Sequence, residues 1–267
     1  MPADHPSRPL LDARALAAAL SGSRWRVEVV AESPSTNALV AGRASEDEPE
    51  GLVVVAEHQS AGRGRLGRVW VTAPRAALTF SLLVTPDAVP VATWPWLPLL
   101  TGLAVVEGVS VCTGLEASLK WPNDVLVADR KVAGILTERI ERPSGAAAVV
   151  GVGINVSSTR AELPVDTATS LALAGAPDVD RGAVLVAVLR SFGLLYDGWV
   201  AAGGAGPRAS YAAACSTLGR RVRVELPTGA PLGGLATDVD DDGRLLVDDG
   251  RRVHVLGAGD VVHVRGG

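Results

Sequence analysis

The hydrophobic pattern of the chain changes after Leu218, and this change constrains the fold more than any other feature. Upstream, segments with helical spacing are interspersed with short apolar runs, which predicts an α/β (α+β) domain. Downstream, five segments with alternating apolar residues are separated by turns rich in Gly, Pro and Asp; they are residues 220–226, 233–239, 243–249, 251–257 and 260–265. Five short strands in about 50 residues predict a small β-barrel. We therefore predict two domains, residues 1–217 and 218–267, in close contact.

The upstream region combines helix and strand patterns. Apolar spacing and N-cap chemistry predict helices over residues 10–20, from Ser33–Asn37 to about Arg43, and over 97–112 and 181–201. Strands are predicted at residues 25–31, 51–57, 69–85, near Leu119, in a hairpin that turns at 128–130, and at 146–156. This interspersed order is typical of proteins with both helices and a sheet.

The charge and the cysteine content exclude several classes of protein. The chain has 25 Lys and Arg against 29 Asp and Glu, and the formal net charge of −4 argues against nucleic-acid binding as the main activity. Cys112 and Cys215 do not form a CxxC pair, which excludes a disulfide scaffold or a cysteine zinc site and indicates a reducing compartment. Asp12 and Arg14 interrupt the N-terminal apolar stretch, and no uninterrupted apolar run approaches about 18 residues. We expect a soluble, cytoplasmic protein without a signal peptide or a membrane span.

A loop rich in glycine and arginine follows the strand predicted at 51–57. Residues 62–68 read GRGRLGR and satisfy the dinucleotide-binding pattern GxGxxG, but that pattern requires a helix directly after it. Residues 69–72 have a strand pattern instead, so we exclude a Rossmann fold. Three arginines alternating with glycines describe a flexible cationic loop that binds phosphate or carboxylate. Considered alone, the loop also fits a DNA minor-groove element or a solvated surface turn.

Both lysines of the chain lie in a second motif, Lys120–Asp124 (KWPND) followed by Lys131–Leu136 (KVAGIL). The chain also has only three asparagines and one glutamine, so these rare residues mark positions where a similar residue would not serve. An ammonium group suits the neutralisation of a transferring phosphoryl oxygen. Asp124 is suited to carrying Mg²⁺ or to accepting a proton. An edge hairpin with a surface lysine is the alternative interpretation.

A third motif is residues 151–156 (GVGINV). Gly151 and Gly153 interrupt a hydrophobic strand and therefore mark the close approach of backbone or ligand. Asn155 would direct a polar amide from the same strand. A β-bulge stabilised by Asn155 is the alternative interpretation.

Acidic residues in the downstream region resemble a calcium-binding loop. Asp238, Asp240 and Asp242 precede Gly243, and Asp249 occupies the twelfth position of the pattern. No helical pattern flanks them and the surrounding alternation has a period of two, so we predict a hairpin turn with solvated acids. The four histidines have neither metal-ligand nor triad spacing, and GxSxG is absent, so no protein metal site and no hydrolase are predicted.

Taken in order, these motifs resemble those of the biotin–protein ligase family. Ser35-Thr36-Asn37, Gln59 with the loop at 62–68, the lysine hairpin and the GVGIN strand follow the family's order, and a small SH3-like terminal domain follows them. The resemblance runs from about residue 25 to the C-terminus. It implies a mixed-sheet catalytic domain of the type shared with class II aminoacyl-tRNA synthetases and lipoate ligases. About 24 residues precede the first predicted strand, too few for the winged-helix repressor domain of some members, so a ligase without DNA-binding repression is implied.

The resemblance also implies a set of site residues. Biotin-contacting positions of the family correspond to Ser35, Thr36, Asn37, Gln59, Arg63, Gly64, Arg65 and Lys131. Positions on the nucleotide side correspond to Arg63, Arg65, Trp70, Asn123, Lys131 and Asn155. Gly134 and Gly153 complete the predicted site, because their strands are expected to wall the biotin pocket.

The reaction implied by the resemblance is the ATP-dependent formation of biotinyl-adenylate and its transfer to one lysine of a biotin carboxyl carrier protein domain of a carboxylase. Arg63, Arg65, Lys131 and Mg²⁺ would neutralise charge at the α-phosphorus of ATP. The loop at 62–68 would close over the product and exclude water. Asp124 would assist the attacking lysine of the carrier.

Two other functions are open alternatives. A lipoate or octanoate ligase or transferase resembles the same domain but lacks the GRGRxGR loop. A non-enzymatic, ligand-binding regulator would use the arginine loop on DNA, and the acidic net charge and the missing helix-turn-helix pattern count against it.

Overall fold

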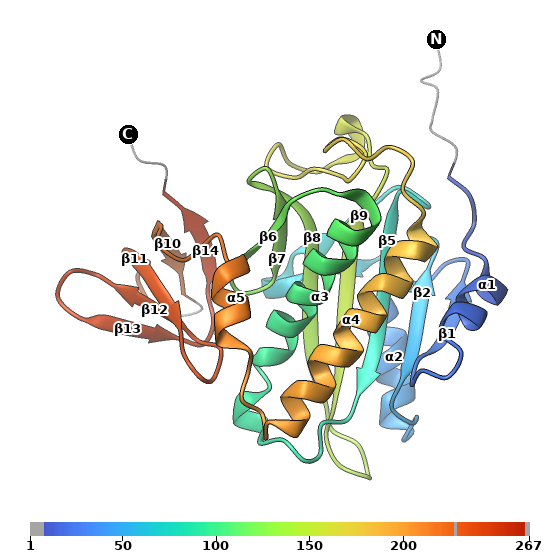
Figure 1. The fold of residues 1–267 in the computed structure, drawn as a ribbon, viewed down its shortest axis with the longest axis horizontal. Helices are drawn as coiled ribbons and strands as arrows, with labels where there is room; N and C mark the ends of the chain where they lie inside the picture. Colours follow the sequence, from blue (N-terminus) through green and yellow to red (C-terminus); the bar gives the residue numbers. More distant parts are fainter. Residues whose placement is uncertain (1–7, 227–228, 265–267) are drawn as a thin grey trace.

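The computed structural model describes residues 8–226 and 229–264, and the larger part of it is built around a seven-stranded sheet (Figure 1). In spatial order, the strands are β1 (Arg26–Val30), β2 (Leu52–Ala56), β5 (Ala77–Val84), β9 (Ala147–Asn155), β8 (Arg130–Ile140), β7 (Asp124–Val127) and β6 (Ala117–Lys120). β1 and β2 are parallel and the other neighbouring pairs are antiparallel, so the sheet is mixed. A separate hairpin consists of β3 (Gly62–Arg63) and β4 (Val69–Trp70).

Helices cover both faces of the sheet. They are α1 (Ala13–Ala19), α2 (Thr36–Ser45), α3 (Trp96–Thr113), α4 (Arg181–Ala201) and α5 (Arg208–Ala214), with 3₁₀ turns at Arg65–Gly67, Val91–Thr93 and Arg160–Glu162. α3 and α4 lie on one face and α2 on the other (Figure 1). Val53 and Val55 of β2 pack into the core beneath α3 and α4, whereas Leu52 and Val54 pack with Val40 of α2. Since β2 is buried on both faces, its sequence is continuously apolar.

α3 and α4 are each long and apolar enough to cross a membrane, with a mean hydropathy of 1.5. Only uninterrupted apolar runs were considered in the sequence, and these two helices were therefore not identified as long and apolar. In the fold, the two helices pack against each other and against the sheet, and 56% of α3 and 44% of the α4 window are buried. The core that they form therefore accounts for their apolar character.

The structure confirms most of the elements predicted upstream of Leu218. The helices predicted at 97–112 and 181–201 are α3 and α4. The predicted hairpin turns at Ala128 and Asp129, whose φ angles of 48° and 58° match a two-residue hairpin turn. The stretch 69–85 is divided into β4 and β5. Helix α5 was not predicted.

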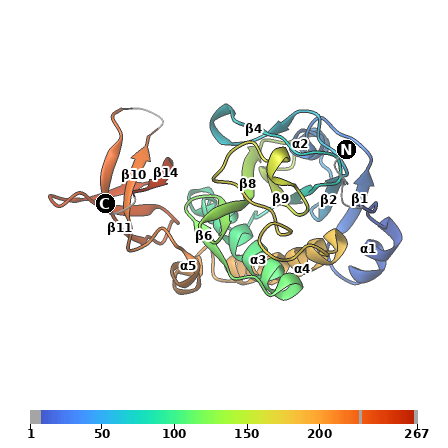
Figure 2. The same ribbon diagram turned by 90° about the horizontal axis from the view of Figure 1, so that it is seen from above.

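The five short strands predicted in the downstream region are present, and they form a small antiparallel sheet. Its strands, β10 (Arg221–Glu225), β11 (Leu232–Val239), β12 (Leu245–Asp248), β13 (Val253–Leu256) and β14 (Asp260–His263), are arranged in the order β13-β12-β11-β10-β14. Arg265, which ends the last predicted segment, lies outside the described residues. Figure 2 shows this C-terminal sheet to one side of the larger part, and α5 contacts α3, β6 and β11 at the junction.

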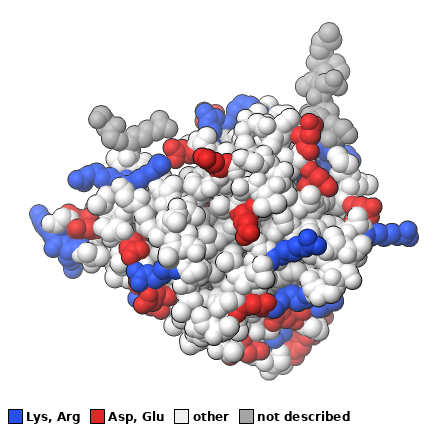
Figure 3. Space-filling view, viewed as in Figure 1, with Lys and Arg blue, Asp and Glu red and all other residues white. Residues whose placement is uncertain are grey.

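Charge is distributed without a dominant field on the face of the molecule shown in Figure 3. Acidic and basic side chains are interspersed over this face. This distribution agrees with the small formal net charge of −4. A broad basic surface of the kind that binds nucleic acid is not seen on this face.

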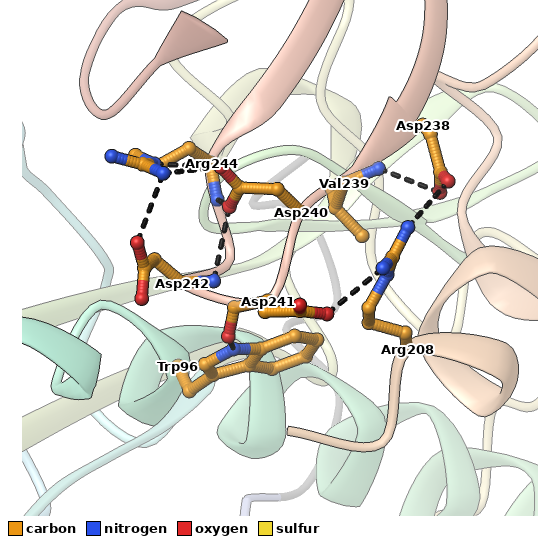
Figure 4. A network of polar contacts seen from close by, with 8 residues as sticks. All are labelled: Trp96, Arg208, Asp238, Val239, Asp240, Asp241, Asp242 and Arg244. Carbon is orange, nitrogen blue, oxygen red and sulfur yellow. Dashed lines mark hydrogen bonds and ion pairs between the residues drawn. The ribbon is translucent and has the colours of Figure 1, made fainter. Parts of the chain in front are cut away.

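The acidic residues between β11 and β12 form a hairpin turn, as predicted (Figure 4). One carboxylate oxygen of Asp240 accepts hydrogen bonds from the backbone N–H groups of Asp242 and Arg244, at 3.0 and 2.9 Å. The other oxygen accepts from the Arg244 side chain at 2.7 Å. Asp240 therefore stabilises the turn through hydrogen bonds to residues of the same turn.

The same turn attaches the C-terminal sheet to the helices (Figure 4). Arg208, the first residue of α5, donates to Asp238 and Asp241 at 2.7 and 2.8 Å. Trp96 of α3 donates from Nε1 to the backbone carbonyl of Asp241 at 2.6 Å. Asp238 and Asp241 thus hold the sheet against α3 and α5.

A buried ion pair fixes the segment before α1. Glu57, which follows β2, and Arg181, which begins α4, are both 6% exposed and lie 2.7 Å apart. Glu57 also accepts from the backbone N–H of Leu11 at 2.6 Å, and Arg181 donates to the backbone carbonyls of Pro9 and Ala77 at 2.7 and 3.3 Å. The pair therefore joins the N-terminal segment, the sheet and α4.

We predict that Glu57→Ala lowers the free energy of unfolding by about 3–5 kcal/mol, because Arg181 would be left buried without its counter-charge. Urea unfolding measures the change. Asp197→Ala serves as the control, since it removes an exposed ion pair with Arg24 and should cost under about 1 kcal/mol. A loss for Glu57→Ala no larger than that of the control would contradict the structural role of the pair.

Candidate active site

A cleft lies between the sheet, α2 and the β3–β4 hairpin. Its inner space is about 120 Å³, and it reaches about 820 Å³ when the open solvent at its mouth is included. Thirteen of the fourteen predicted site residues line it: Ser35, Thr36, Asn37, Gln59, Arg63, Gly64, Arg65, Trp70, Asn123, Asp124, Lys131, Gly134 and Gly153. The fold therefore brings motifs that are far apart in the sequence into one place. Asn155 is the exception.

The side chain of Asn155 is buried at the end of β9 and does not line the cleft. Its Nδ2 donates to the backbone carbonyl of Thr169 at 3.0 Å. Thr169 N donates to Lys131 O, and Lys131 N donates to Thr167 O, both at 2.8 Å. Asn155 thus supports the segment that fixes the backbone of Lys131. β9 pairs with both neighbours without a register shift, so the alternative of a bulge was wrong.

Uncharged polar side chains form the floor of the cleft at the start of α2. Ser35 caps the helix, and its Oγ accepts from Ala38 N at 3.4 Å. Gln59 Oε1 accepts from the N–H and the hydroxyl of Thr36, at 2.8 and 3.0 Å. Ser81, in β5, places its hydroxyl 2.8 Å from Thr36 Oγ1. Such a floor suits a ligand group that is polar but uncharged.

Asn37 joins this floor to strand β8. Its Oδ1 lies 2.5 Å from the hydroxyl of Ser81. Its Nδ2 donates to the backbone carbonyl of Leu136 at 3.1 Å and to Glu138 Oε2 at 2.6 Å. Both amide hydrogens are therefore used within the protein, and the orientation of the Asn37 amide is fixed by its partners.

Two glycines of β9 make room for side chains from other elements. A Cβ atom on Gly151 would lie 2.0 Å from Asn37 Oδ1, and a Cβ atom on Gly153 would lie 2.4 Å from Trp70 Cε2. The sequence predicted the close approach of backbone or ligand at both positions; the structure shows a close approach, but by side chains. The side chains of Asn37 and Trp70 can lie on the sheet only because these glycines lack a Cβ.

The loop at 62–68 is a short hairpin rather than a helix N-terminus, which confirms the exclusion of a Rossmann fold. Its arginines are attached to three different elements. Arg63 Nη2 donates to Glu138 Oε2 of β8 at 3.1 Å. Arg65 Nη1 donates to Asn123 Oδ1 at 3.1 Å and approaches the carbonyl of Gly259 at 3.4 Å.

The third arginine pairs with the C-terminal sheet. Arg68 binds the carboxylate of Asp260 at the start of β14 with both Nη atoms. Burial acts to raise the pKa of Asp260, but the hydrogen bond and charge of Arg68 outweigh it, so this pKa lies below its usual value. The same hydrogen bond raises the pKa of Arg68.

Burial lowers the pKa of Arg65, and the negative charge of Asp124 opposes this lowering. Arg65 is therefore a desolvated cation beside the cleft, where its charge is screened little by water.

Lys131 and Asp124 form an ion pair at the wall of the cleft, with Nζ 2.6 Å from Oδ1. The ammonium also lies 5.9 Å from the centre of the Trp70 ring. A Cβ atom on Gly134 would lie 3.1 Å from Lys131 Nζ, so the end of the Lys131 side chain packs directly over this glycine. The indole Nε1 of Trp70 is buried without a hydrogen-bond partner among the described residues. A ligand acceptor would satisfy it, which fits the predicted place of Trp70 on the nucleotide side.

Sequence reasoning missed three residues of the site. Ser81 is, with Thr79, one of two hydroxyl residues within the otherwise apolar run of β5, a signal that was present in the sequence. Glu138 follows Gly134 and Leu136 at the strand period of two, and so lies on the same face of β8. Asp260 had no such signal, because it lies 192 residues from its partner Arg68.

The acidic groups of the cleft fit a magnesium ion that is held mainly by a ligand. Asp124 and Asp260 are its carboxylates, and among residues 8–226 and 229–264 no three His, Cys, Asp or Glu side chains form a metal-binding group. Mg²⁺ is commonly held by one or two carboxylates together with substrate phosphates. Asp124, beside the cations, is the residue suited to this role.

Comparisons with known proteins agree with this geometry. Residues 28–155 match the model of the biotin/lipoate A/B protein ligase family, and residues 217–264 match that of the biotin protein ligase C-terminal domain. A biotin–[acetyl-CoA-carboxylase] ligase of Mycobacterium tuberculosis is 45% identical over 97% of each chain. The bifunctional ligase/repressor BirA of Bacillus subtilis is 33% identical over 82% of this chain and 68% of its own length.

Solved structures give the same result. The biotin protein ligase of Aquifex aeolicus in complex with biotin and ATP has a TM-score of 0.76 and 28% identity, and the match covers 90% of this chain and 99% of that one. The fold and the cleft thus define a ligase of the class that includes biotin and lipoate ligases, with a small SH3-like C-terminal domain. The chain belongs to the biotin protein ligase family.

We predict that Gly153→Ala detaches the β3–β4 hairpin, because the added Cβ would displace the Trp70 indole. Hydrogen exchange of a peptide covering residues 62–70 should accelerate about tenfold or more, while the free energy of unfolding falls by about 1–3 kcal/mol. Gly42→Ala in α2 is the control, since its Cβ would meet nothing within 4 Å. Unchanged exchange at 62–70 in Gly153→Ala would contradict the role of this contact.

Proposed function

We propose that this protein is a biotin–[biotin carboxyl carrier protein] ligase, which forms biotinyl-5′-AMP from biotin and ATP and transfers the biotinyl group to a carrier lysine. One observation carries the proposal. A single cleft joins an uncharged polar floor, made by Thr36 and Gln59, to a cationic wall, made by Arg65 and Lys131. Biotin has an uncharged ring system at one end and a carboxylate at the other, so it matches this polarity.

In the first half-reaction, a biotin carboxylate oxygen attacks the α-phosphorus of ATP and pyrophosphate leaves. Two anions must approach each other, and the charges of Arg65 and Lys131 stabilise the negative charge that develops between them. Asp124 orients the Lys131 ammonium, which the segment 167–169 also fixes through its backbone. Arg63 also lines the cleft with a half-exposed side chain and would meet the phosphate side. Asp124 would hold Mg²⁺, which would supply further positive charge at the phosphates.

The product of this step is a mixed anhydride that water destroys. The β3–β4 hairpin covers the cleft, and its arginines are attached to β8, to Asn123 and to the C-terminal sheet. Closure of this hairpin over the intermediate would exclude water and retain the intermediate until a carrier arrives.

In the second half-reaction, the neutral amine of a carrier lysine attacks the carbonyl carbon of the anhydride, and AMP leaves with its pair of electrons. The attacking nitrogen loses one proton. Asp124 lines the cleft beside Lys131, so it would be suited to accept that proton. The partner is a biotin carboxyl carrier protein domain of an acyl-CoA carboxylase.

The organisation proposed for the chain follows from the same assignment. Residues 1–217 form the catalytic domain and residues 218–267 the C-terminal SH3-like domain. Because Asp260 contributes to the cleft, the C-terminal domain is part of the functional enzyme. The protein acts in the cytoplasm, where both of its free cysteines stay reduced.

Pyrophosphate exchange into ATP tests the proposal, with biotin, lipoate, octanoate or no acid. Exchange that depends on biotin is the expected result. Exchange with lipoate or octanoate instead would place the protein with the lipoate ligases, whose family model covers the same residues. No exchange with any acid would overturn the enzyme assignment.

We predict that Lys131→Ala lowers the rate of biotin-dependent pyrophosphate exchange by about 10²–10³-fold, since it removes a positioned charge from the transition state. The urea midpoint should change little. Lys120→Ala is the matched control, because it replaces the other lysine of the chain, which does not line the cleft. Exchange near the wild-type rate in Lys131→Ala would remove Lys131 from the mechanism.

A further inference from the structure

Glu138 lies between the floor of the cleft and the hairpin that covers it. One oxygen of its carboxylate, Oε2, accepts from Asn37 Nδ2 at 2.6 Å and from Arg63 Nη2 at 3.1 Å. Asn37 is 4% exposed and belongs to the floor, whereas the Arg63 side chain is 47% exposed and belongs to the hairpin. A single atom thus connects a buried part of the site to the exposed hairpin at its mouth.

The connection continues inward to the side chains that face a ligand. Ser81 has one hydroxyl proton and two acceptors within reach, Thr36 Oγ1 at 2.8 Å and Asn37 Oδ1 at 2.5 Å. A ligand N–H group that donates to Thr36 Oγ1 would compete there with Ser81 and leave the Ser81 proton for Asn37. That bond strengthens the orientation in which Leu136 and Glu138 already hold the Asn37 amide, with its nitrogen toward Glu138.

The orientation of the Asn37 amide matters for the carboxylate. In the reverse orientation, Asn37 Oδ1 would face the negative charge of Glu138, and Nδ2 would face the Ser81 hydroxyl. With Asn37 fixed as a donor, the carboxylate is held 3.1 Å from Arg63. Charge-assisted hydrogen bonds of this kind are about twice as strong as neutral ones.

We propose that Glu138 is a positioning residue that couples occupancy of the floor of the cleft to closure of the β3–β4 hairpin. It acts through Arg63 and does not touch the reacting atoms. The proposal rests on the proposed function for the identity of the ligand, biotin. The contact of Glu138 with Arg63 of the hairpin does not depend on which ligand binds.

Trypsin provides a direct test, because Arg63, Arg65 and Arg68 make the open hairpin a substrate. Without ligand, Glu138→Gln should raise the rate of cleavage in this hairpin about two- to fivefold, as expected for loss of a partly exposed ion pair. In wild type, biotin should slow the cleavage. In Glu138→Gln, that protection should fall about threefold or more, even with biotin at a saturating concentration.

The matched control is Glu141→Gln. Glu141 is 73% exposed and pairs with Arg139 at 2.6 Å, so it offers the same chemical change just beyond the end of β8 without a contact to the hairpin. Its cleavage rate should equal that of wild type. The urea midpoints of both variants should also equal that of wild type, which separates opening of the hairpin from general unfolding.

A double-mutant cycle with Arg63→Ala shows whether Glu138 acts through Arg63. Cleavage after Arg65 and Arg68 is followed in both backgrounds, and Glu138→Gln should add nothing once Arg63 is absent. A full effect of Glu138→Gln in the Arg63→Ala background would overturn the proposed route. If Glu138→Gln is cleaved without ligand at the same rate as wild type, Glu138 does not restrain the hairpin. If biotin fails to protect wild type while lipoate protects it, the proposed function fails and the ligand-free result still decides the role of Glu138.

Discussion

The closeness of two side chains to the backbone of β9 determines the rest of the site. Asn37 comes from α2 and Trp70 from the β3–β4 hairpin, and each occupies the space that a Cβ atom would take at Gly151 or Gly153. Because both side chains lie directly on the sheet, the floor of the cleft and its cover meet at one central strand. Larger residues at these two positions would push the floor and the cover apart, and the polar and cationic groups would no longer face one ligand.

The cleft also depends on parts of the chain that are distant in sequence. Arg63 is held by β8, Arg65 by the KWPND motif and Arg68 by β14 of the C-terminal sheet. That sheet is itself attached to α3 and α5 through the acidic turn at 238–242. The hairpin is therefore fixed by two partly exposed ion pairs, each of modest strength, and by the hydrogen bonds of Arg65, which suits a cover that must open and close.

Local patterns were sufficient to predict the elements of the fold, and long-range pairings were not. Helix α4 and the five downstream strands follow from periodicity, and the failure of GRGRLGR as a Rossmann motif follows from the strand pattern after it. The glycines of β9 predicted a close approach but not its partners. Glu138 lies 75 residues from Arg63 and Asp260 lies 192 residues from Arg68, so only the folded chain shows these pairs. The predicted contact of Asn155 with the nucleotide stays a prediction, because its side chain supports Thr169 beside the cleft.

Biotin binding to a Gly151→Ala variant tests the central claim most directly. The new Cβ would lie 2.0 Å from Asn37 Oδ1, so Asn37 would leave the floor while the buried strand stays paired. Isothermal titration should show biotin affinity at least about tenfold weaker than in wild type, with a urea midpoint that confirms a folded protein. Wild-type affinity in the folded variant would contradict the claim that the missing Cβ at Gly151 creates the biotin site.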